Sequence, residues 1–141
     1  DLNYRRPHAA QLDEVRPYME ENIALSTIVR ASTDDLEIVK ASLPSIGQSH
    51  PIDGKGFIVT AGAGPISLYT AHGELTQQTP KITPVSTVGA GDNFNAGFIC
   101  QYIQLGLCPN TDSWTKEQWL SMAKRGQEFG QKVCMSWENS I

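Results

Sequence analysis

The sequence predicts an α/β fold with three layers, in which helices cover both faces of a Rossmann-like sheet. Segments typical of strands alternate along the chain with segments typical of helices. Near the middle, short apolar runs separated by glycine turns indicate an antiparallel meander at one edge of the sheet. A glycine-rich turn then leads directly into a long helix. Alternating strands and helices are the pattern of layered α/β domains, so these observations give the fold class.

The first part of the chain is expected to alternate between helix and strand. A helix is expected near Gln11 to Asn22, a strand near Leu25 to Ala31 and a second helix near Thr33 to Ser42. A looser stretch follows from Leu43 to Lys55, because prolines and glycines punctuate it.

The second part is expected to form the meander and two long helices. Strands are expected near Gly56 to Ala61 and Ile66 to Thr70, and a turn at 71–74 leads to an edge run from Leu75 to Ile82. The helices are expected near Ala90 to Leu107 and Thr115 to Val133. In the first of these helices, apolar side chains recur at the spacing of a buried face: Phe94, Phe98, Tyr102 and Leu105.

The glycine turn before the first long helix is the most informative stretch of the chain. Pro84 disfavours helix upstream of it, so the helix should begin near Ala90. A helix start leaves backbone N–H groups unpaired and carries partial positive charge. The amides of Gly89, Ala90 and Gly91 can therefore cradle an anion, which glycines allow to approach closely. Asp92 follows directly, and a carboxylate there is suited to accept a proton from a hydroxyl that attacks a phosphate.

The same turn also has a purely structural interpretation. An aspartate at the beginning of a helix is often a cap, and Gly-Ala-Gly is often only a tight turn. Two named phosphate motifs do not fit. The third glycine of the dinucleotide fingerprint would fall on Phe94, and no Gly-Lys-Ser/Thr follows the turn, as a Walker A loop requires.

A longer string around the turn resembles the C-terminal signature of the ribokinase-like (PfkB) carbohydrate kinases, usually Asp-Thr-x-Gly-Ala-Gly-Asp-x-Phe. The string is Thr87-Val88-Gly89-Ala90-Gly91-Asp92-Asn93-Phe94. The resemblance implies that Gly89, Ala90 and Gly91 form the anion hole of that family and that Asp92 is its catalytic base. Ser86 stands where the family has its first aspartate, in a segment that helps several members bind a monovalent cation. Activation by potassium is therefore left open.

A second glycine turn, after the apolar strand that starts at Phe57, resembles the nucleotide loop of the same family, Thr-x-Gly-x-x-Gly. Thr60 and Gly62 match that pattern. Pro65 stands at the position of the second glycine, and Gly64 lies one residue earlier. The resemblance implies that Thr60, Gly62 and Gly64 approach ATP. Without the resemblance, a strand that runs into Gly-Ala-Gly indicates only a turn.

Other segments follow the family pattern in the same order. Ser32 and Asp35 stand where the family has Asn-x-x-Glu, a pair associated with magnesium and phosphate, although Ser-x-x-Asp also fits a helix capping box. The opening Asp1-Leu2-Asn3-Tyr4-Arg5 is similar to the family's Asp-Pro-Asn-x-Arg, and its arginine could face phosphate or solvent. In the last helix, which the family uses near adenine, Gly126 and Gly130 permit close approach, and Gly126 is assigned to the cofactor-binding set.

The length of the chain indicates how much of a full-length family member it covers. A chain of 141 residues supports one domain with a real core. Sugar kinases of the family are roughly twice as long as this chain. We therefore expect residues 1–141 to be the nucleotide-binding and catalytic C-terminal half, a fragment that lacks the N-terminal half and the sugar-binding lid.

Composition and charge argue against several other classes of function. A net charge of −4 disfavours binding to nucleic acid or to an anionic membrane, which needs basic patches. No run approaches a membrane span and no signal peptide opens the chain, so a cytoplasmic protein is expected. The cysteines lack Cys-x-x-Cys spacing and are interpreted as free thiols: Cys100, Cys108 and Cys134.

Together with the resemblance, these residues predict a fructokinase- or ribokinase-like enzyme that uses ATP to phosphorylate a sugar hydroxyl. Asp92 is expected to take the hydroxyl proton, while the turn stabilises the transferring phosphoryl group and Mg²⁺ bridges the nucleotide phosphates, mostly through water. A nucleoside kinase of the same fold, a non-catalytic module that binds nucleotide or sugar, and a structural domain stay open as alternatives. The expected partners are ATP and a small sugar, and a homodimer is one option for the full-length form.

Overall fold

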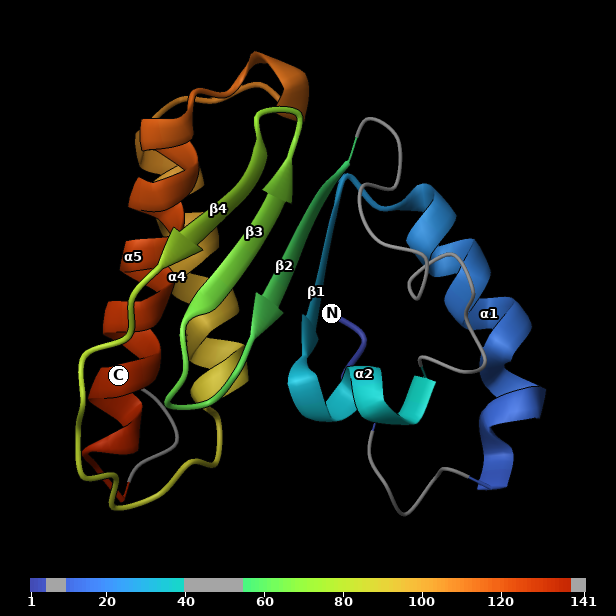
Figure 1. The fold of residues 1–141 in the computed structure, drawn as a ribbon, viewed down its shortest axis with the longest axis horizontal. Coiled ribbons are helices and arrows are strands. Elements are labelled where there is room, and N and C mark those ends of the chain that lie inside the picture. Colours follow the sequence, from blue (N-terminus) through green and yellow to red (C-terminus); the bar gives the residue numbers. More distant parts are fainter. Residues whose placement is uncertain (5–9, 40–54, 138–141) are drawn as a thin grey trace.

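The computed structural model describes residues 1–4, 10–39 and 55–137 of the chain (Figure 1). The described elements are, in chain order, α1 (Leu12–Leu25), β1 (Ile28–Ser32), α2 (Thr33–Val39), β2 (Gly56–Thr60), β3 (Ile66–Thr70), β4 (Gly73–Gln77), α4 (Ala90–Gln104), the short 3-10 helix η2 (Thr111–Ser113) and α5 (Lys116–Cys134). Every helix and strand expected from the sequence is found within these ranges, although several boundaries differ.

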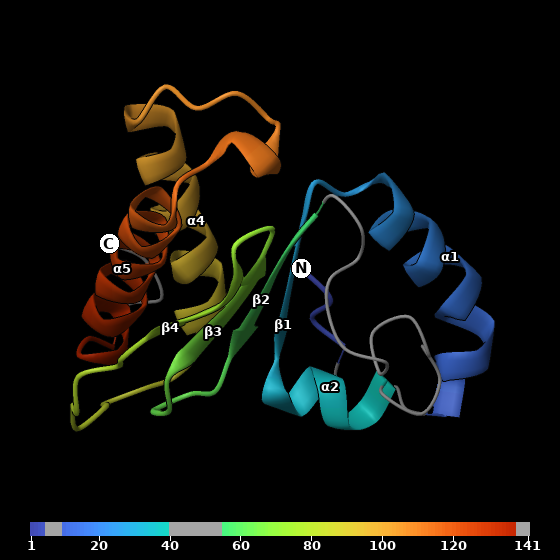
Figure 2. The ribbon, with the colours of Figure 1, turned by 45° about the horizontal axis from the view of Figure 1, so that its top comes forward.

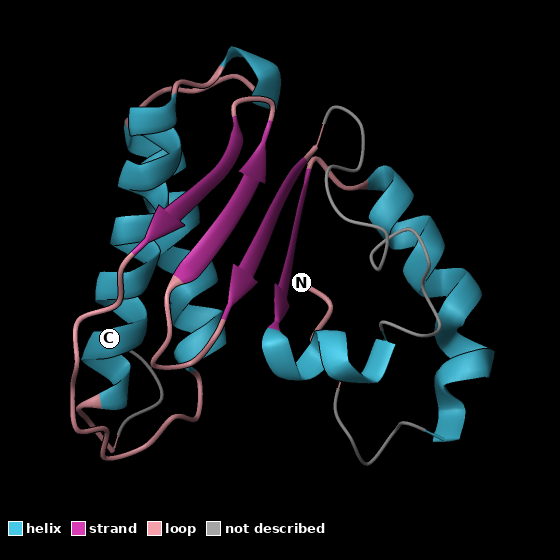
Figure 3. Cartoon of the chain, in the orientation of Figure 1, coloured by secondary structure: helices cyan, strands magenta, loops and turns pink. Residues whose placement is uncertain are grey.

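The strands form one mixed sheet in the order β1-β2-β3-β4 (Figure 3). β1 and β2 are parallel, with Ala31 opposite Val59, whereas β2–β3 and β3–β4 are antiparallel. Thr70 pairs directly with Gly73, so Ala71 and His72 alone connect β3 to β4. The antiparallel meander expected at one edge of the sheet is therefore confirmed.

Helices cover both faces of the sheet, which confirms the three-layer arrangement. Figures 1 and 2 show α4 and α5 together on one side of the sheet and α1 on the other. The alternation of side chains along a strand explains how one sheet serves two cores. Phe57 and Ile58 are neighbours in β2, yet Phe57 packs in the core under α1 and Ile58 packs in the core under α4 and α5.

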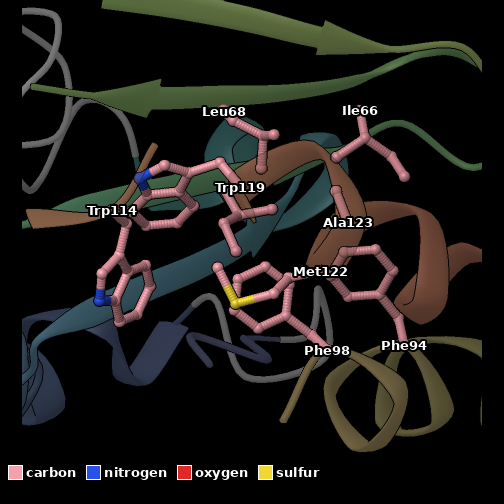
Figure 4. Close-up of a cluster of buried hydrophobic side chains, with 9 residues drawn as sticks. Ile66, Leu68, Phe94, Phe98, Trp114, Trp119, Met122 and Ala123 are labelled. Atoms are coloured by element: carbon pink, nitrogen blue, oxygen red, sulfur yellow. The ribbon is translucent and has the colours of Figure 1, made fainter. Parts of the chain in front are cut away.

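The larger core lies between the meander and the α4–α5 pair (Figure 4). Trp119 is fully buried, and its ring centre lies 4.8 Å from that of Trp114 and 6.2 Å from that of Phe98. Ile66 and Leu68 of β3 pack on the same cluster. Large aromatic side chains each remove much apolar area from water, so this cluster helps to hold α5 on the sheet.

Glycines allow α4 and α5 to approach each other closely. A Cβ atom built on Gly97 would lie 2.6 Å from the carbonyl oxygen of Arg125, and one built on Gly126 would lie 2.7 Å from that of Phe94. Both separations are too short for real atoms, so a larger residue at either position would push the helices apart. The close packing fixes the axis of α4 and the direction of its first backbone amides.

The smaller core lies under α1 on the opposite face of the sheet. Leu12 and Ile23 of α1 are buried there with Val29, Ala31 and Phe57. The apolar face of α1 continues to Ile23, beyond the expected helix end at Asn22, and the helix ends at Leu25. The start of the first strand was therefore predicted too early: β1 begins at Ile28 and not near Leu25.

Two further boundaries differ from the expectation. The strand predicted over Leu75 to Ile82 begins at Gly73 and ends at Gln77, because the tight turn sets the register with β3. After Gln77 the chain follows α5, where the side-chain amides of Gln127 and Gln131 donate to main-chain carbonyls of this segment. The predicted helix end at Ser42 and the loose stretch from Leu43 to residue 54 lie outside the described residues, which resume at Lys55.

Two further features of the described structure concern the cysteines and the length of the helices. Cys100, Cys108 and Cys134 are free thiols, and burial raises the pKa of the Cys134 thiol. None of the helices in the described ranges is both long and apolar enough to cross a lipid bilayer.

The two central tryptophans differ in one polar contact, which gives a stability prediction. The indole N–H of Trp114 donates to the carbonyl oxygen of Cys108 over 2.8 Å, whereas that of Trp119 is buried with no hydrogen-bond partner in the described structure. Trp114→Phe removes this hydrogen bond, whereas Trp119→Phe removes none. We therefore expect Trp114→Phe to lower the free energy of unfolding by about 1 kcal/mol more than Trp119→Phe.

Urea denaturation of the complete protein, followed by circular dichroism, measures both substitutions. Each variant controls for the other, because both replace a fully buried indole with a phenyl ring. A larger loss for Trp119→Phe would contradict the expected contribution of the Trp114 hydrogen bond.

Candidate functional site

A cavity of about 460 Å³ lies where the end of β1 meets the first turn of α4. Its walls come from the opening residues of the chain, the end of β1, α2 and the turn before α4. The lining residues from that turn are Thr87, Val88, Gly89, Gly91 and Asp92. In α/β folds, ligands bind outside the carboxyl ends of parallel strands, and β1 and β2 are the parallel pair here.

The turn that begins α4 is built around Gly89. Its φ of 78° is left-handed, which glycine adopts without strain, and it is the N-cap of the helix. The first turn is closed by Asn93, whose backbone amide and side-chain amide both donate to the carbonyl oxygen of Gly89, over 2.9 and 3.0 Å. α4 thus begins at Ala90, the position expected from the sequence.

The predicted anion-hole residues do not all occupy equivalent positions. Gly89 and Gly91 line the cavity together with Asp92. Ala90 is absent from its described lining, and its amide donates to the carbonyl oxygen of Thr87 over a long 3.3 Å. The structure therefore brings two of the three predicted amide donors and the predicted base to one opening.

Arg30 of β1 is a site residue that the sequence reasoning missed. Its side chain is only 13% exposed and lines the cavity. One terminal nitrogen, Nη1, donates to Asp1 Oδ2 and the other, Nη2, donates to Thr60 Oγ1, both over 2.8 Å. Burial lowers the pKa of Arg30, and the charges of Asp35 and Asp92 oppose that shift. The available signal was an arginine inside the apolar run of a strand, where a charge needs partners.

Ser32 and Asp35 form the capping box that the sequence allowed. The backbone amide and the hydroxyl of Ser32 both donate to Asp35 Oδ2 over 2.8 Å, and the Asp35 amide donates back to Ser32 Oγ over 3.0 Å. Asp35 is 7% exposed, and both residues line the cavity. The pair therefore begins α2 and at the same time faces the volume in which the predicted metal would lie.

The opening residues run beside β1 and connect it to α4. The Leu2 amide donates to the Arg30 carbonyl oxygen over 2.9 Å. Asp1 Oδ2 accepts from Arg30 and also from the side-chain amide of Asn95 on α4, over 2.9 Å. Arg5, the arginine of the family-like opening, lies outside the described residues.

The predicted nucleotide loop forms a turn between β2 and β3. The Gly64 amide donates to the Ala61 carbonyl oxygen over 2.8 Å, and Gly62 has a left-handed φ of 57°. Gly62 and Gly64 lie outside the cavity lining, and Thr60 reaches the site only through its bond to Arg30. The approach of this loop to ATP stays a prediction.

Gly126 and Ser86, the two remaining residues of interest, have structural partners. Gly126 packs against Phe94 between α4 and α5, away from the cavity, so the helix contact accounts for this glycine. The Ser86 hydroxyl accepts from the Val88 amide over 3.2 Å, and the Ser86 amide donates to the Cys134 carbonyl oxygen. Neither contact bears on adenine or potassium binding.

The carboxylates of the cavity fit a magnesium ion held mainly by water and phosphate. Asp34, Asp35 and Asp92 line the same volume. In the described part of the chain, no group of three or more acidic, histidine or cysteine residues forms a complete metal site. Mg²⁺ is commonly held by one or two carboxylates together with substrate phosphates and waters, so these carboxylates would need such further ligands to hold it.

The fold is that of ribokinase-like α/β proteins, and a glycine turn followed by an aspartate begins α4 beside the cavity. Residues 1–136 match the pfkB family of carbohydrate kinases, and the chain belongs to that family. The aminoimidazole riboside kinase of Salmonella typhimurium (strain LT2) is 30% identical over 108 residues, which are 70% of this chain and 32% of that protein. The chain thus spans about a third of the length of this relative.

Solved structures with the same fold include kinases of different acceptors. The aminoimidazole riboside kinase from Salmonella enterica, complexed with aminoimidazole riboside and an ATP analogue, matches with a TM-score of 0.73 and 21% identity over 96% of this chain and 45% of its own. The fructokinase from Vibrio cholerae O395, bound to fructose, ADP and calcium, has a TM-score of 0.72 and 18% identity over 92% and 41%. The adenosine kinase from Schistosoma mansoni, in complex with 2-fluoroadenosine, has a TM-score of 0.65 and 21% identity over 94% and 41%.

The capping box gives a prediction about stability that does not depend on catalysis. We expect Ser32→Ala and Asp35→Ala each to lower the free energy of unfolding by about 1 kcal/mol. Because both substitutions remove the same bonds, the double variant should lose less than the sum of the two. Asp34→Ala is the matched control, since Asp34 is exposed on the same first turn of α2.

Urea denaturation of the three single variants and the double variant measures this coupling. Additive losses for Ser32 and Asp35, or an equal loss for Asp34→Ala, would mean that the reciprocal bonds do not stabilise α2.

Proposed function

We propose that this protein is an ATP-dependent kinase that transfers a phosphoryl group to an alcohol of a small sugar or sugar derivative. The observation that carries the proposal is the shared cavity of Gly89, Gly91 and Asp92, at the N-terminus of a helix and beside the ends of parallel strands. The membership of the pfkB family supports the same reaction class. The matched residues are less than half of the related chains, so the activity is proposed for the complete protein.

In this proposal the acceptor oxygen attacks the terminal phosphorus of ATP in line with the departing group. The Asp92 carboxylate takes the hydroxyl proton as the new O–P bond forms. The bond between the terminal phosphorus and the bridging oxygen breaks, and ADP leaves with that electron pair. The amides of Gly89 and Gly91, with the partial positive charge of the helix end, stabilise the oxygens of the phosphoryl group during transfer.

The proposal assigns magnesium and nucleotide contacts to the remaining predicted residues. Mg²⁺, when bound, neutralises the nucleotide phosphates. Asp35, held by Ser32, faces that volume and would accept hydrogen bonds from water on the ion. Thr60, Gly62 and Gly64 would contact the nucleotide through the main chain of their loop. A contact of Gly126 with the cofactor and a cytoplasmic location also belong to the proposal, whereas activation by potassium stays open.

A sugar acceptor and a nucleoside acceptor are the two forms of this proposal. The related structures include a kinase bound to fructose and others bound to aminoimidazole riboside or 2-fluoroadenosine. The identities to these structures are too low to transfer an acceptor. The chemistry assigned to Asp92 and the turn is the same for both acceptors, because each presents a primary or secondary alcohol.

Asp92→Asn tests the base directly. We expect the substitution to lower kcat of the complete protein by a factor of about 100 or more, because the amide cannot accept the proton. The dissociation constant of ATP should change little, since the amides and the loop are untouched. Product formation and calorimetric ATP binding measure the two quantities, and Asp112→Asn in the exposed η2 segment is the control. Turnover close to that of the wild type would remove Asp92 from the base role.

A panel of acceptors separates the enzyme from its non-catalytic alternative. With ATP and Mg²⁺ present, we expect ADP to accumulate with at least one sugar or nucleoside acceptor and not in the absence of acceptor. A binding module would instead show ligand-induced thermal stabilisation without ADP, and a structural domain would show neither. The panel needs fructose, ribose and ketogluconate together with adenosine and another riboside.

A further inference from the structure

We infer that Arg30 is a positioning residue, which fixes the first turn of α4 against the ends of β1 and β2 and makes glycine necessary at position 91. The kinetic part of this inference rests on the proposed function. Its structural part depends only on the contacts between Arg30 and its neighbours.

Arg30 holds three separate segments of the site together. Its terminal nitrogens donate to Asp1 in the opening segment and to Thr60 at the end of β2, each over 2.8 Å. Its guanidinium carbon lies 5.8 Å from the centre of the Phe94 ring on α4. A planar cation with several donors in a fixed fork can hold such partners in a set geometry, whereas a lysine presents its three donors on one nitrogen at the end of a flexible stem.

The guanidinium also occupies the space beside Gly91. A Cβ atom built on Gly91 would lie 2.8 Å from Nη1, 3.0 Å from Nη2 and 3.3 Å from Cζ of Arg30. Gly91 is inside α4 and is not among the residues with positive φ, so its backbone conformation suits any residue. The requirement for glycine therefore comes from Arg30 and not from backbone strain. It also differs from the cause expected from the sequence, which was the close approach of a ligand.

The guanidinium cannot withdraw from Gly91 without losing its own bonds. Asp1 and Thr60 hold both terminal nitrogens, and Asp1 is itself bound by Asn95 on the next turn of α4. Asp92 lies between these two contact points on α4, one residue after Gly91. The contacts on both sides fix the turn that carries the Asp92 carboxylate and the Gly91 amide.

A double-mutant cycle between positions 30 and 91 tests the structural part. In the complete wild-type protein we expect Gly91→Ala to lower the melting temperature by about 2 to 4 °C, because the methyl group displaces Arg30. In the Arg30→Ala background the same change should leave the melting temperature unchanged or raise it, since alanine favours a helix over glycine. Equal decreases in both backgrounds would overturn the inference.

A second background keeps the cycle informative if Arg30→Ala does not fold. Arg30→Lys removes both terminal nitrogens that lie nearest to Gly91 and keeps the charge. The decrease caused by Gly91→Ala should then be smaller than in the wild type. An undiminished decrease in the lysine background would also overturn the inference.

Kinetics of the complete protein test the functional part. We expect Arg30→Ala to lower kcat about 10- to 100-fold, with a change in the ATP dissociation constant of less than about threefold, because misplaced groups affect the transition state more than the bound substrate. Arg30→Lys should recover part of the lost kcat. Arg125→Ala is the matched control: Arg125 pairs with Glu128 over 3.0 Å and lies 4.8 Å from the Phe129 ring, outside the cavity lining.

The outcomes separate this inference from the proposed function. A kcat for Arg30→Ala equal to that of Arg125→Ala would overturn a positioning role. A loss of ATP affinity larger than the loss of kcat would also overturn it, because Arg30 would then bind the nucleotide directly. If the wild-type protein phosphorylates no acceptor, the proposed function fails, and the melting-temperature cycle alone decides whether Arg30 fixes the α4 turn.

Discussion

The close packing of α4 on α5 is the constraint on which the site depends. A helix end can bind an anion only if its unpaired amides keep facing the same volume. Gly97 and Gly126 let the two helix backbones meet, and the aromatic cluster around Trp119 holds α5 on the sheet. The axis of α4 is therefore fixed by the core. Gly91 and Asp92, on the first turn, face the cavity as a consequence of that packing.

One buried cation joins the core to the site. Arg30 is taken out of water in the middle of β1, which costs free energy unless partners offset the loss of hydration. Its partners Asp1 and Thr60 belong to two other segments of the site, and its neighbour Phe94 belongs to the large core. The same contacts thus contribute to stability and to the geometry of the first α4 turn. A substitution at this arginine should affect both properties, which is why folding and turnover have to be measured separately.

Features that depend on neighbouring residues, such as the start of a helix, could be predicted from the sequence. The α4 helix begins at Ala90 as expected, because Pro84 disfavours an earlier start and the left-handed Gly89 lies directly before the helix. The arginine in an apolar strand indicated a partnered charge, but the partners of Arg30 could not be predicted, since they lie 29 and 30 residues away along the chain and no periodic pattern links them. Gly126 illustrates a different limit. A glycine on a helix face serves a ligand or a second helix equally well, and only the structure assigns it to the contact with Phe94.

The charges of the cavity impose a condition on the proposed reaction. Asp34, Asp35 and Asp92 line it, while Arg30, the cation among the described lining residues, is already paired with Asp1. The helix N-terminus adds only about half an elementary charge. A free triphosphate would therefore meet net repulsion, and it can bind only with cations that accompany its phosphates. Under the proposed function the substrate is thus the magnesium complex of ATP, in which the cation would offset the charge of the phosphates near these carboxylates.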